Sequence, residues 1–219
     1  MIRENVKKIL SELPDGVELV AVIKGRPVEQ VLEVIDGGVS IIGVNYLKDV
    51  NKLYQVIGNR VKWHYIGIAR FEKHDLLRRK YLEVFDMIET VDSAELAEDF
   101  DKKCSQIGKV MPVLIEVNIA REPQKSGVIP ENVESLIREV SGLKNIKVMG
   151  LMTMGPLVED SESLRPYFRE TKRLFDHIKS MEIPNVEMRY LSMGMSDSYR
   201  IAIEEGANIV RIGTKLFEE

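Results

Sequence analysis

Two short segments near the end of the chain have the composition of an anion-binding site. Residues 192–196 (SMGMS) and residues 213–214 (GT) combine glycine with hydroxyl side chains, and each segment follows a short apolar run. Glycine lets the backbone approach an anion closely, while serine and threonine supply hydroxyl donors. In barrels of alternating strands and helices, a phosphate is frequently held after strands seven and eight. The residues predicted to hold a phosphate are Ser192, Gly194, Gly213 and Thr214.

A lysine ends the first apolar run of the chain, residues 18–24 (ELVAVIK). Because side chains alternate along a strand, Lys24 shares a face with Val20 and Val22. At the C-terminal edge of a barrel strand, an ammonium group would be partly desolvated, which favours the free amine that attacks an aldehyde. The alternative is that Lys24 only marks the point where a buried strand enters a solvated loop.

An arginine lies within the last apolar run, residues 208–212 (NIVRI). A buried guanidinium without an acceptor is very costly, so Arg211 must have a partner. One explanation is a salt bridge to another strand, although no single acid stands out as that partner. The other is a ligand acceptor such as a pyridine nitrogen, which arginine would leave unprotonated. An amine, a phosphate site and this arginine together suggest a seat for pyridoxal phosphate.

The elements that must position these residues alternate between strands and helices. The predicted strands are residues 18–24, 39–44, 63–66, 84–89, 112–118, 147–152, 188–192 and 208–212. Helical periodicity separates most of them, as in residues 93–107, 131–140 and 197–205. Eight strands with crossover helices favour a single (β/α)8 TIM barrel formed by residues 1–219. An open doubly wound sheet is the alternative, but no G-x-G-x-x-G pattern follows the first strand.

An extra helix is predicted before the first strand, over residues 3–13. Only residues 213–219 follow the eighth strand, which is too few for a full eighth helix. We therefore expect the N-terminal helix to cover the part of the helical ring that the C-terminus leaves open.

Composition narrows the classes of protein and partner. The chain has 219 residues, a single cysteine (Cys104) and a net charge of −4 that is spread along its length. It contains no apolar run of about eighteen residues, which a membrane span would need. The sequence therefore predicts a cytoplasmic, monomeric protein with no intramolecular disulfide, no cysteine-based metal cluster, no membrane segment and no nucleic-acid partner.

The chain resembles the pyridoxal phosphate homeostasis proteins, also called the proline synthetase co-transcribed family, which are single-barrel relatives of the alanine racemase N-terminal domain. The likeness runs in order through residues 19–24 (LVAVIK), 43–46 (GVNY), 63–67 (WHYIG), 91–93 (VDS), 117–119 (VNI), 125–128 (KSGV), 150–153 (GLMT), 191–196 (LSMGMS) and 210–214 (VRIGT). The chain departs from the family pattern at Val44, which replaces a glutamate, at Ile23 and Gly25 beside the lysine, and at residues 69–73 and 197–198.

The resemblance implies a role for each candidate residue. Lys24 would form the Schiff base with pyridoxal phosphate, Arg211 would contact the pyridine nitrogen, and Asn45 would lie near the ring. The residues implied to hold the phosphate are Ser192, Gly194, Gly213 and Thr214. The departures leave the lysine, the arginine and the phosphate positions unchanged.

The resemblance also implies a function in vitamin B6 homeostasis, namely storing, carrying or buffering a reactive aldehyde cofactor, with apoenzymes that require pyridoxal phosphate as possible partners. Racemisation needs acids or bases on both faces of the cofactor, and the resembled racemases take one of them from a second domain. We therefore expect a binding protein rather than an enzyme. Two alternatives stay open: a slow amino-acid racemase, and a cofactor-free enzyme that uses Lys24 as a Schiff-base lysine on a phosphorylated substrate.

Overall fold

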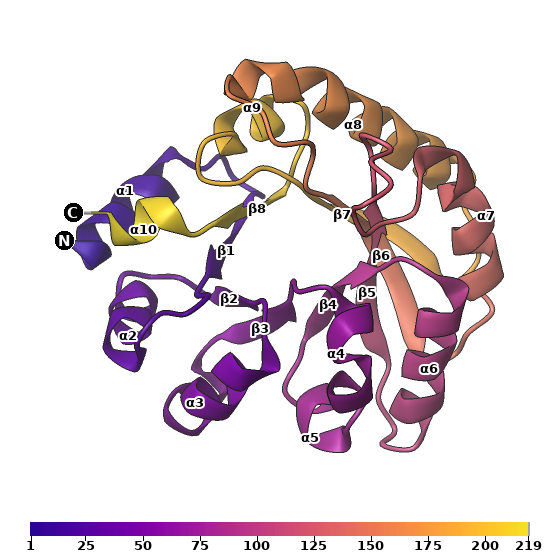
Figure 1. The fold of residues 1–219 in the computed structure, drawn as a ribbon, viewed down its shortest axis with the longest axis horizontal. Coiled ribbons are helices and arrows are strands. Elements are labelled where there is room, and N and C mark those ends of the chain that lie inside the picture. The colour runs from indigo at the N-terminus through magenta and orange to yellow at the C-terminus, as the bar shows by residue number, and fades with distance from the viewer. Residues whose placement is uncertain (219) are drawn as a thin grey trace.

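Eight parallel strands form a closed barrel in the computed structural model, which describes residues 1–218 (Figure 1). Each strand pairs with the next along the chain, and the eighth pairs with the first, so the sheet has no free edge. The strands are β1 (Glu18–Val22), β2 (Ile41–Val44), β3 (Lys62–Tyr65), β4 (Met87–Val91), β5 (Met111–Val117), β6 (Ile146–Thr153), β7 (Val186–Ser192) and β8 (Ile209–Ile212). The predicted (β/α)8 TIM barrel is confirmed.

Helices surround the barrel and cover its outer face (Figure 1). They are α1 (Ile2–Glu12), α2 (Val28–Asp36), α3 (Leu47–Ile57), α4 (Ala69–Leu76), α5 (Arg79–Leu82), α6 (Ala94–Ser105), α7 (Pro130–Val140), α8 (Arg165–Ser180), α9 (Tyr199–Glu204) and α10 (Thr214–Phe217), with the 3-10 helices η1 (Gly58–Arg60) and η2 (Ser161–Leu164). Among these described helices, none combines the length and the apolar character that crossing a membrane requires.

The strands read as nearly continuous apolar runs because both of their faces are buried. All four residues of β2 and all five of β4 are buried. Side chains that face outward join the main core beneath the helices. Side chains that face inward include a small apolar cluster of Val20, Ile41 and Ile209, which fills part of the barrel. The barrel interior is therefore a packed core, and buried polar groups within it need partners.

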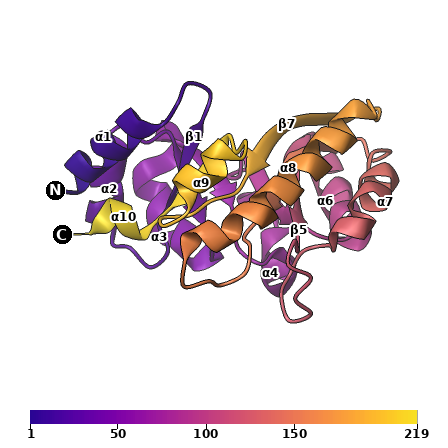
Figure 2. The ribbon, with the colours of Figure 1, turned by 90° about the horizontal axis from the view of Figure 1, so that it is seen from above.

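The N-terminal helix closes the ring next to the short C-terminal helix, as the sequence predicts. Figures 1 and 2 show α1 beside α10, with the two chain ends close together. The Asn5 side chain donates hydrogen bonds to the carbonyl oxygens of Leu216, at 3.4 Å, and Glu218, at 2.9 Å. Helix α1 thus ties the C-terminal segment after β8 to the barrel.

Several predicted boundaries are shifted: β1 ends at Val22 rather than at residue 24, and β2 begins at Ile41 rather than at residue 39. The fourth strand begins at Met87 rather than at residue 84, because Val84 and Phe85 form a turn in which their amides donate to the Tyr81 carbonyl oxygen. Both residues are buried, so an apolar run extends beyond the strand itself. The helix predicted to open at Ser196–Asp197 begins at Tyr199.

Candidate cofactor site

A cavity of about 640 Å³ opens at the C-terminal end of the barrel. Its lining comes from the ends of all strands except β2 and β7 and from the segments that follow all strands except β4 and β8. Three of the predicted site residues, Lys24, Asn45 and Arg211, line this one cavity. The barrel therefore brings together side chains that are far apart in the sequence, at the end where barrel enzymes build their sites.

Lys24 lies in a turn two residues beyond the end of β1. The amide of Arg26 donates to the carbonyl oxygen of Ile23 at 3.0 Å, and Gly25 has a positive φ of 69°. The Lys24 side chain is exposed, so the expected partial desolvation is wrong. Its Nζ lies 5.3 Å from the centroid of the Tyr46 ring. The amine is thus accessible at the cavity and flanked by an aromatic face.

Asn45 follows β2 and carries an acceptor without a partner. Its Oδ1 is buried and receives no hydrogen bond from residues 1–218. A buried polar atom without a partner is costly, so such an atom is often satisfied by a ligand or a water molecule. The backbone here is tightly packed, because a Cβ at Gly67 would overlap the carbonyl oxygen of Asn45. Asn45 is therefore fixed in place with a free acceptor beside the cavity.

Arg211 is only 2% exposed, yet it lines the cavity. Its Nη1 donates to Ser192 Oγ at 2.7 Å, and its Nη2 donates to the carbonyl oxygen of Thr153 at 2.9 Å. The Ser192 hydroxyl in turn donates to Glu89 Oε2 at 2.7 Å. Glu89 Oε1 is hydrogen-bonded to His64 Nδ1, also at 2.7 Å. The buried side chains of Ser192, Glu89 and His64 thus form one hydrogen-bonded network that holds the guanidinium in place.

Glu89 is the acid that the sequence did not identify as a partner of Arg211. Burial disfavours its ionised form, but the hydrogen bond and charge of His64 and the charge of Arg211 together lower the pKa of this carboxyl. Burial lowers the pKa of Arg211, and the charge of Glu89 opposes that change. The first explanation for Arg211, a salt bridge to another strand, is therefore confirmed only in part. Glu89 compensates the charge of Arg211, but the hydrogen bonds that connect the two residues run through Ser192. The guanidinium still contributes to the cavity wall.

A second buried carboxyl, Glu116 on β5, also lines the cavity. It is 5% exposed, and Ser126 Oγ donates to its Oε1 at 2.9 Å. Burial is the main cause that raises the pKa of Glu116 to about 7, and the nearby charge of Asp92 adds to it. The charges of Arg211 and Arg70 act in the opposite direction. Sequence reasoning missed this residue, although an acid within an apolar strand was a usable signal.

The two predicted phosphate turns meet at the same end of the barrel. The amide of Lys215 donates to Ser196 Oγ at 3.5 Å, which joins the turn after β7 to the turn after β8. Met195 from the first turn lines the cavity. The predicted phosphate residues Ser192, Gly194, Gly213 and Thr214 are not among the residues that line it. They lie on the two segments that flank it, and their contact with a phosphate remains a prediction.

The first turn needs Gly194 for its own conformation. Gly194 has a φ of 94°, and a Cβ there would lie 2.5 Å from the Cβ of Ala202 in α9. At Gly213 the φ is not positive, and a Cβ would lie 3.3 Å from the Cβ of Val22. Close packing against α9 therefore explains Gly194 without any ligand, whereas Gly213 has a looser environment.

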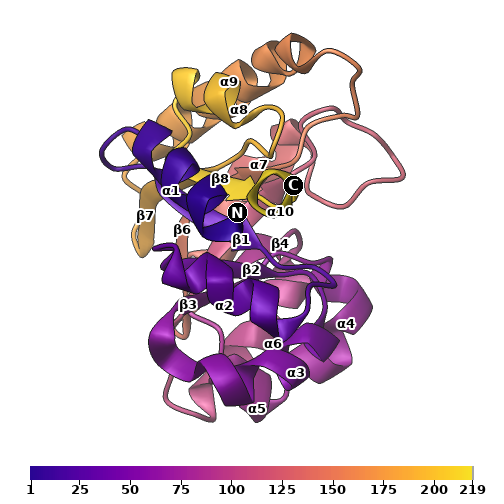
Figure 3. The same cartoon turned by 90° about the vertical axis from the view of Figure 1, so that its left-hand side faces the viewer.

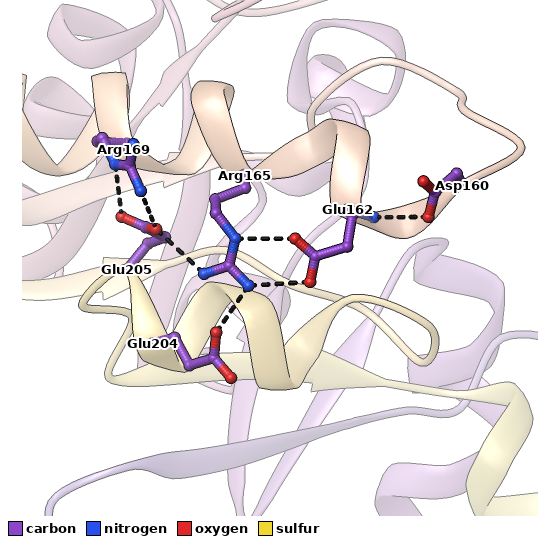
Figure 4. Close-up of polar contacts among 6 residues, drawn as sticks. All are labelled: Asp160, Glu162, Arg165, Arg169, Glu204 and Glu205. Carbon is purple, nitrogen blue, oxygen red and sulfur yellow. Dashed lines mark hydrogen bonds and ion pairs between the residues drawn. The ribbon is translucent and has the colours of Figure 1, made fainter.

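An ion-pair network fastens α9 to α8 (Figure 4). Arg165 contacts Glu162 at 2.8 Å, Glu204 at 2.7 Å and Glu205 at 3.2 Å. Arg169 also contacts Glu205, at 2.9 Å. Networks of several charges stabilise more than isolated surface pairs do. Since α9 directly follows the turn after β7, this network helps to hold that turn against the barrel.

Comparisons with known proteins agree with this architecture. The sequence profile of the family described as "Alanine racemase, N-terminal domain" matches residues 1–218. The pyridoxal phosphate homeostasis protein of Aquifex aeolicus (strain VF5) is 38% identical over 203 residues, which cover 92% of this chain and 86% of that protein. The protein of the same name from Vibrio alginolyticus is 34% identical and covers 99% of this chain and 96% of its own length.

Solved structures show the same fold. PipY of Synechococcus elongatus PCC7942, in a structure with PLP bound, superposes with a TM-score of 0.89 at 26% identity and covers 100% of both chains. An alanine racemase of Clostridium difficile 630 has a TM-score of 0.79 at 18% identity, and the match covers 56% of that longer chain. The racemase likeness concerns the fold alone. The match over nearly the whole chain and the identity to full-length relatives show that this chain belongs to the alanine racemase N-terminal domain family and, within it, to the pyridoxal phosphate homeostasis proteins.

Proposed function

We propose that this protein binds pyridoxal phosphate in the barrel cavity and serves vitamin B6 homeostasis by storing the cofactor and passing it to enzymes that require it. One observation carries the proposal: Lys24, Asn45 and Arg211 come from three separate segments and line one cavity. The bound PLP in the structure of the relative PipY supports it.

The groups at the cavity fit this cofactor chemically. Lys24 offers an exposed primary amine, which is the group that an aldehyde needs. Arg211 offers a fixed donor for a ring nitrogen, and the free Oδ1 of Asn45 offers an acceptor for a hydroxyl group. A volume of about 640 Å³ lies within the range of small-molecule and cofactor pockets, which is roughly 300–1,000 Å³.

Each residue has a distinct task in this proposal. Bound pyridoxal phosphate supplies an aldehyde that reacts reversibly with a primary amine, and Lys24 provides that amine. Arg211 keeps its proton, because arginine is a very weak acid and Glu89 lies behind it. A ring nitrogen held beside Arg211 would therefore stay unprotonated, which would disfavour carbanion chemistry. The flanking turns, with Ser192, Gly194, Gly213 and Thr214, are proposed to hold the phosphate.

Transfer of the cofactor tests the carrier function. The protein is loaded with pyridoxal phosphate, freed of excess cofactor and mixed with an aminotransferase from which the cofactor has been removed. We expect aminotransferase activity to return in proportion to the cofactor loaded. The Lys24→Ala variant, treated in the same way, should restore almost no aminotransferase activity. A loaded protein that releases no cofactor to an excess of apoenzyme would refute carriage.

A slow racemase is the second candidate, because Glu116 places a titratable carboxyl in the same cavity as Lys24. Two such groups on opposite faces are what racemisation requires. Incorporation of deuterium at Cα of alanine in heavy water separates the candidates. The carrier proposal predicts very slow exchange, whereas turnover of roughly 1 to 1,000 per second would establish an enzyme. A purified protein that neither absorbs in the visible region nor binds pyridoxal phosphate would favour the cofactor-free Schiff-base enzyme.

The proposal extends to the cellular setting. Apoenzymes that require pyridoxal phosphate are the proposed recipients, and we propose that the carrier acts as a monomer in the cytoplasm.

A further inference from the structure

The cavity has an outer part that the proposed cofactor contacts leave unexplained. Four large apolar side chains line it and are exposed to solvent: Ile68 (39%), Phe71 (74%), Met154 (43%) and Leu157 (93%). We refer to these four residues as the apolar rim. Two belong to the start of α4 and the residue before it, and two belong to the loop after β6. Large exposed apolar side chains gathered around one opening are typical of a binding site.

The loops that carry part of this rim project from one end of the barrel. Figures 2 and 3 show the segments after β5 and β6 extending beyond the neighbouring helices on the same side. Lys125 joins the two loops, because its Nζ donates to the carbonyl oxygen of Gly155 at 3.1 Å. The loop that carries Leu157 is thus tied at Gly155 to the loop after β5.

A guanidinium and a carboxyl group accompany the apolar rim. Arg70 is exposed and lines the cavity, and its Cζ lies 5.3 Å from the centroid of the Phe71 ring. No carboxylate among residues 1–218 lies within 4.0 Å of its guanidinium. Lys125 also lines the cavity, but it is paired with Glu122 at 2.6 Å. Glu116 lies deeper in the cavity, and the charge of Arg70 reaches it. The cavity therefore presents a guanidinium without a carboxylate partner near its mouth and, below it, a carboxyl that ionises near pH 7.

These features specify a ligand by its chemistry. A guanidinium binds a carboxylate well, a carboxylate binds an ammonium group, and the apolar rim favours a large apolar side chain. A phosphorylated sugar does not match the apolar rim, and a simple fatty acid leaves Glu116 without a partner. An α-amino acid with a large apolar side chain satisfies all three features.

We propose that the outer cavity binds α-amino acids with large apolar side chains, with the carboxylate on Arg70, the ammonium group at Glu116 and the side chain against the apolar rim. This inference rests on the proposed function, because the amino acid would bind beside the cofactor held on Lys24. Binding at this site would let the concentration of free amino acids influence how the protein retains pyridoxal phosphate.

Calorimetry with L-leucine at pH 8, where the Glu116 carboxyl is ionised, tests this site. Borohydride reduction first fixes pyridoxal phosphate to Lys24, so that amine exchange is impossible and only non-covalent binding produces heat. Glycine lacks the side chain, 3-methylbutylamine lacks the carboxylate, and 4-methylpentanoate lacks the amine. Each should bind at least about tenfold more weakly than L-leucine, because each loses one charged hydrogen-bonded contact or one buried aliphatic group.

Variants of the rim and of the free cation provide the second arm. Arg70→Gln should weaken the binding of L-leucine at least about tenfold and the binding of 3-methylbutylamine much less, since that amine has no carboxylate. Arg173 is an exposed arginine on α8, and Arg173→Gln is the matched control, which should change the affinity for neither ligand. Leu157→Ser should weaken the binding of L-leucine and leave the retention of pyridoxal phosphate unchanged.

The outcomes separate this inference from the proposed function. Failure to fix any cofactor on Lys24 would refute the proposed function itself. Cofactor fixed on Lys24 without heat from L-leucine, or equal affinity for L-leucine and glycine, would overturn only the amino-acid site. Sedimentation velocity of the native protein and of Phe71→Ser gives one further contradicting result. A native dimer that this substitution dissociates, together with no L-leucine binding, would make the apolar rim an interface between two copies.

Discussion

The buried carboxyl of Glu116 should make the protein less stable as the pH rises. Its pKa increases from the ordinary 4.5 to about 7 in the folded chain, chiefly because of burial. Below pH 4.5 the group is protonated in both the folded and the unfolded states. Between 4.5 and about 7 the unfolded chain ionises while the folded chain keeps its proton, so stability falls with rising pH. Above that range both states are ionised and the loss is complete.

The size of this loss follows from the two pKa values. One pKa unit corresponds to about 1.4 kcal/mol, so Glu116 should destabilise the fold by about 3 kcal/mol at pH 8 relative to pH 4. Glu116→Gln removes the titration and keeps an oxygen that can accept the hydrogen bond from Ser126. The substitution should therefore raise the free energy of unfolding at pH 8 by about 3 kcal/mol more than at pH 4.

Urea denaturation of the native protein and of Glu116→Gln, measured from pH 4 to pH 8.5, checks this expectation. Other groups titrate alike in both proteins, so the difference between them isolates Glu116. Glu98→Gln, on the exposed face of α6, is the matched control because it makes the same substitution outside the cavity. A constant difference for Glu116→Gln would refute the reasoning. So would a difference that favours the native protein at high pH, because the carboxylate would then be stabilised by the fold.

Further substitutions test the buried network and the barrel wall. Glu89→Gln leaves the buried charge of Arg211 uncompensated, so the free energy of unfolding in urea should fall by about 3 kcal/mol or more; a change near zero would mean that the charge of Glu89 is not needed. Gly150→Ala should lower it by more than about 4 kcal/mol or prevent folding, because a Cβ would overlap the carbonyl oxygen of Tyr190 and Gly150 has a φ of 145°. Gly142→Ala, where no atom lies within 4 Å of the added Cβ, is the control and should change stability by less than about 0.5 kcal/mol.

Much of the barrel could be predicted because its strands are buried on both faces and therefore form apolar runs. The structure places strands at all eight predicted positions, with shifted ends. The boundary of β4 was missed because Val84 and Phe85 are buried by tertiary packing while they form a turn. Apolar character reports burial, and only hydrogen bonding decides whether a buried residue is in a strand.

The site could be predicted only in part, for a related reason. Lys24 and Arg211 stand out locally, as a lysine and an arginine in apolar runs. The partners of Arg211 do not, because Ser192 and Glu89 are separated by 103 positions and meet only across the closed barrel. The accessible position of Lys24 likewise depends on β1 ending at Val22, which no composition rule specifies.

Mapping of the fixed cofactor tests the central claim most directly. The protein is incubated with pyridoxal phosphate, reduced with borohydride and digested, and the modified peptide is located by mass spectrometry. The account predicts one modified residue, Lys24, and no modification of Lys24→Ala above the level of a protein denatured before treatment. A modified Lys125 or Lys215 in the native protein, or an undiminished adduct in Lys24→Ala, would contradict the assignment of the cofactor to this cavity.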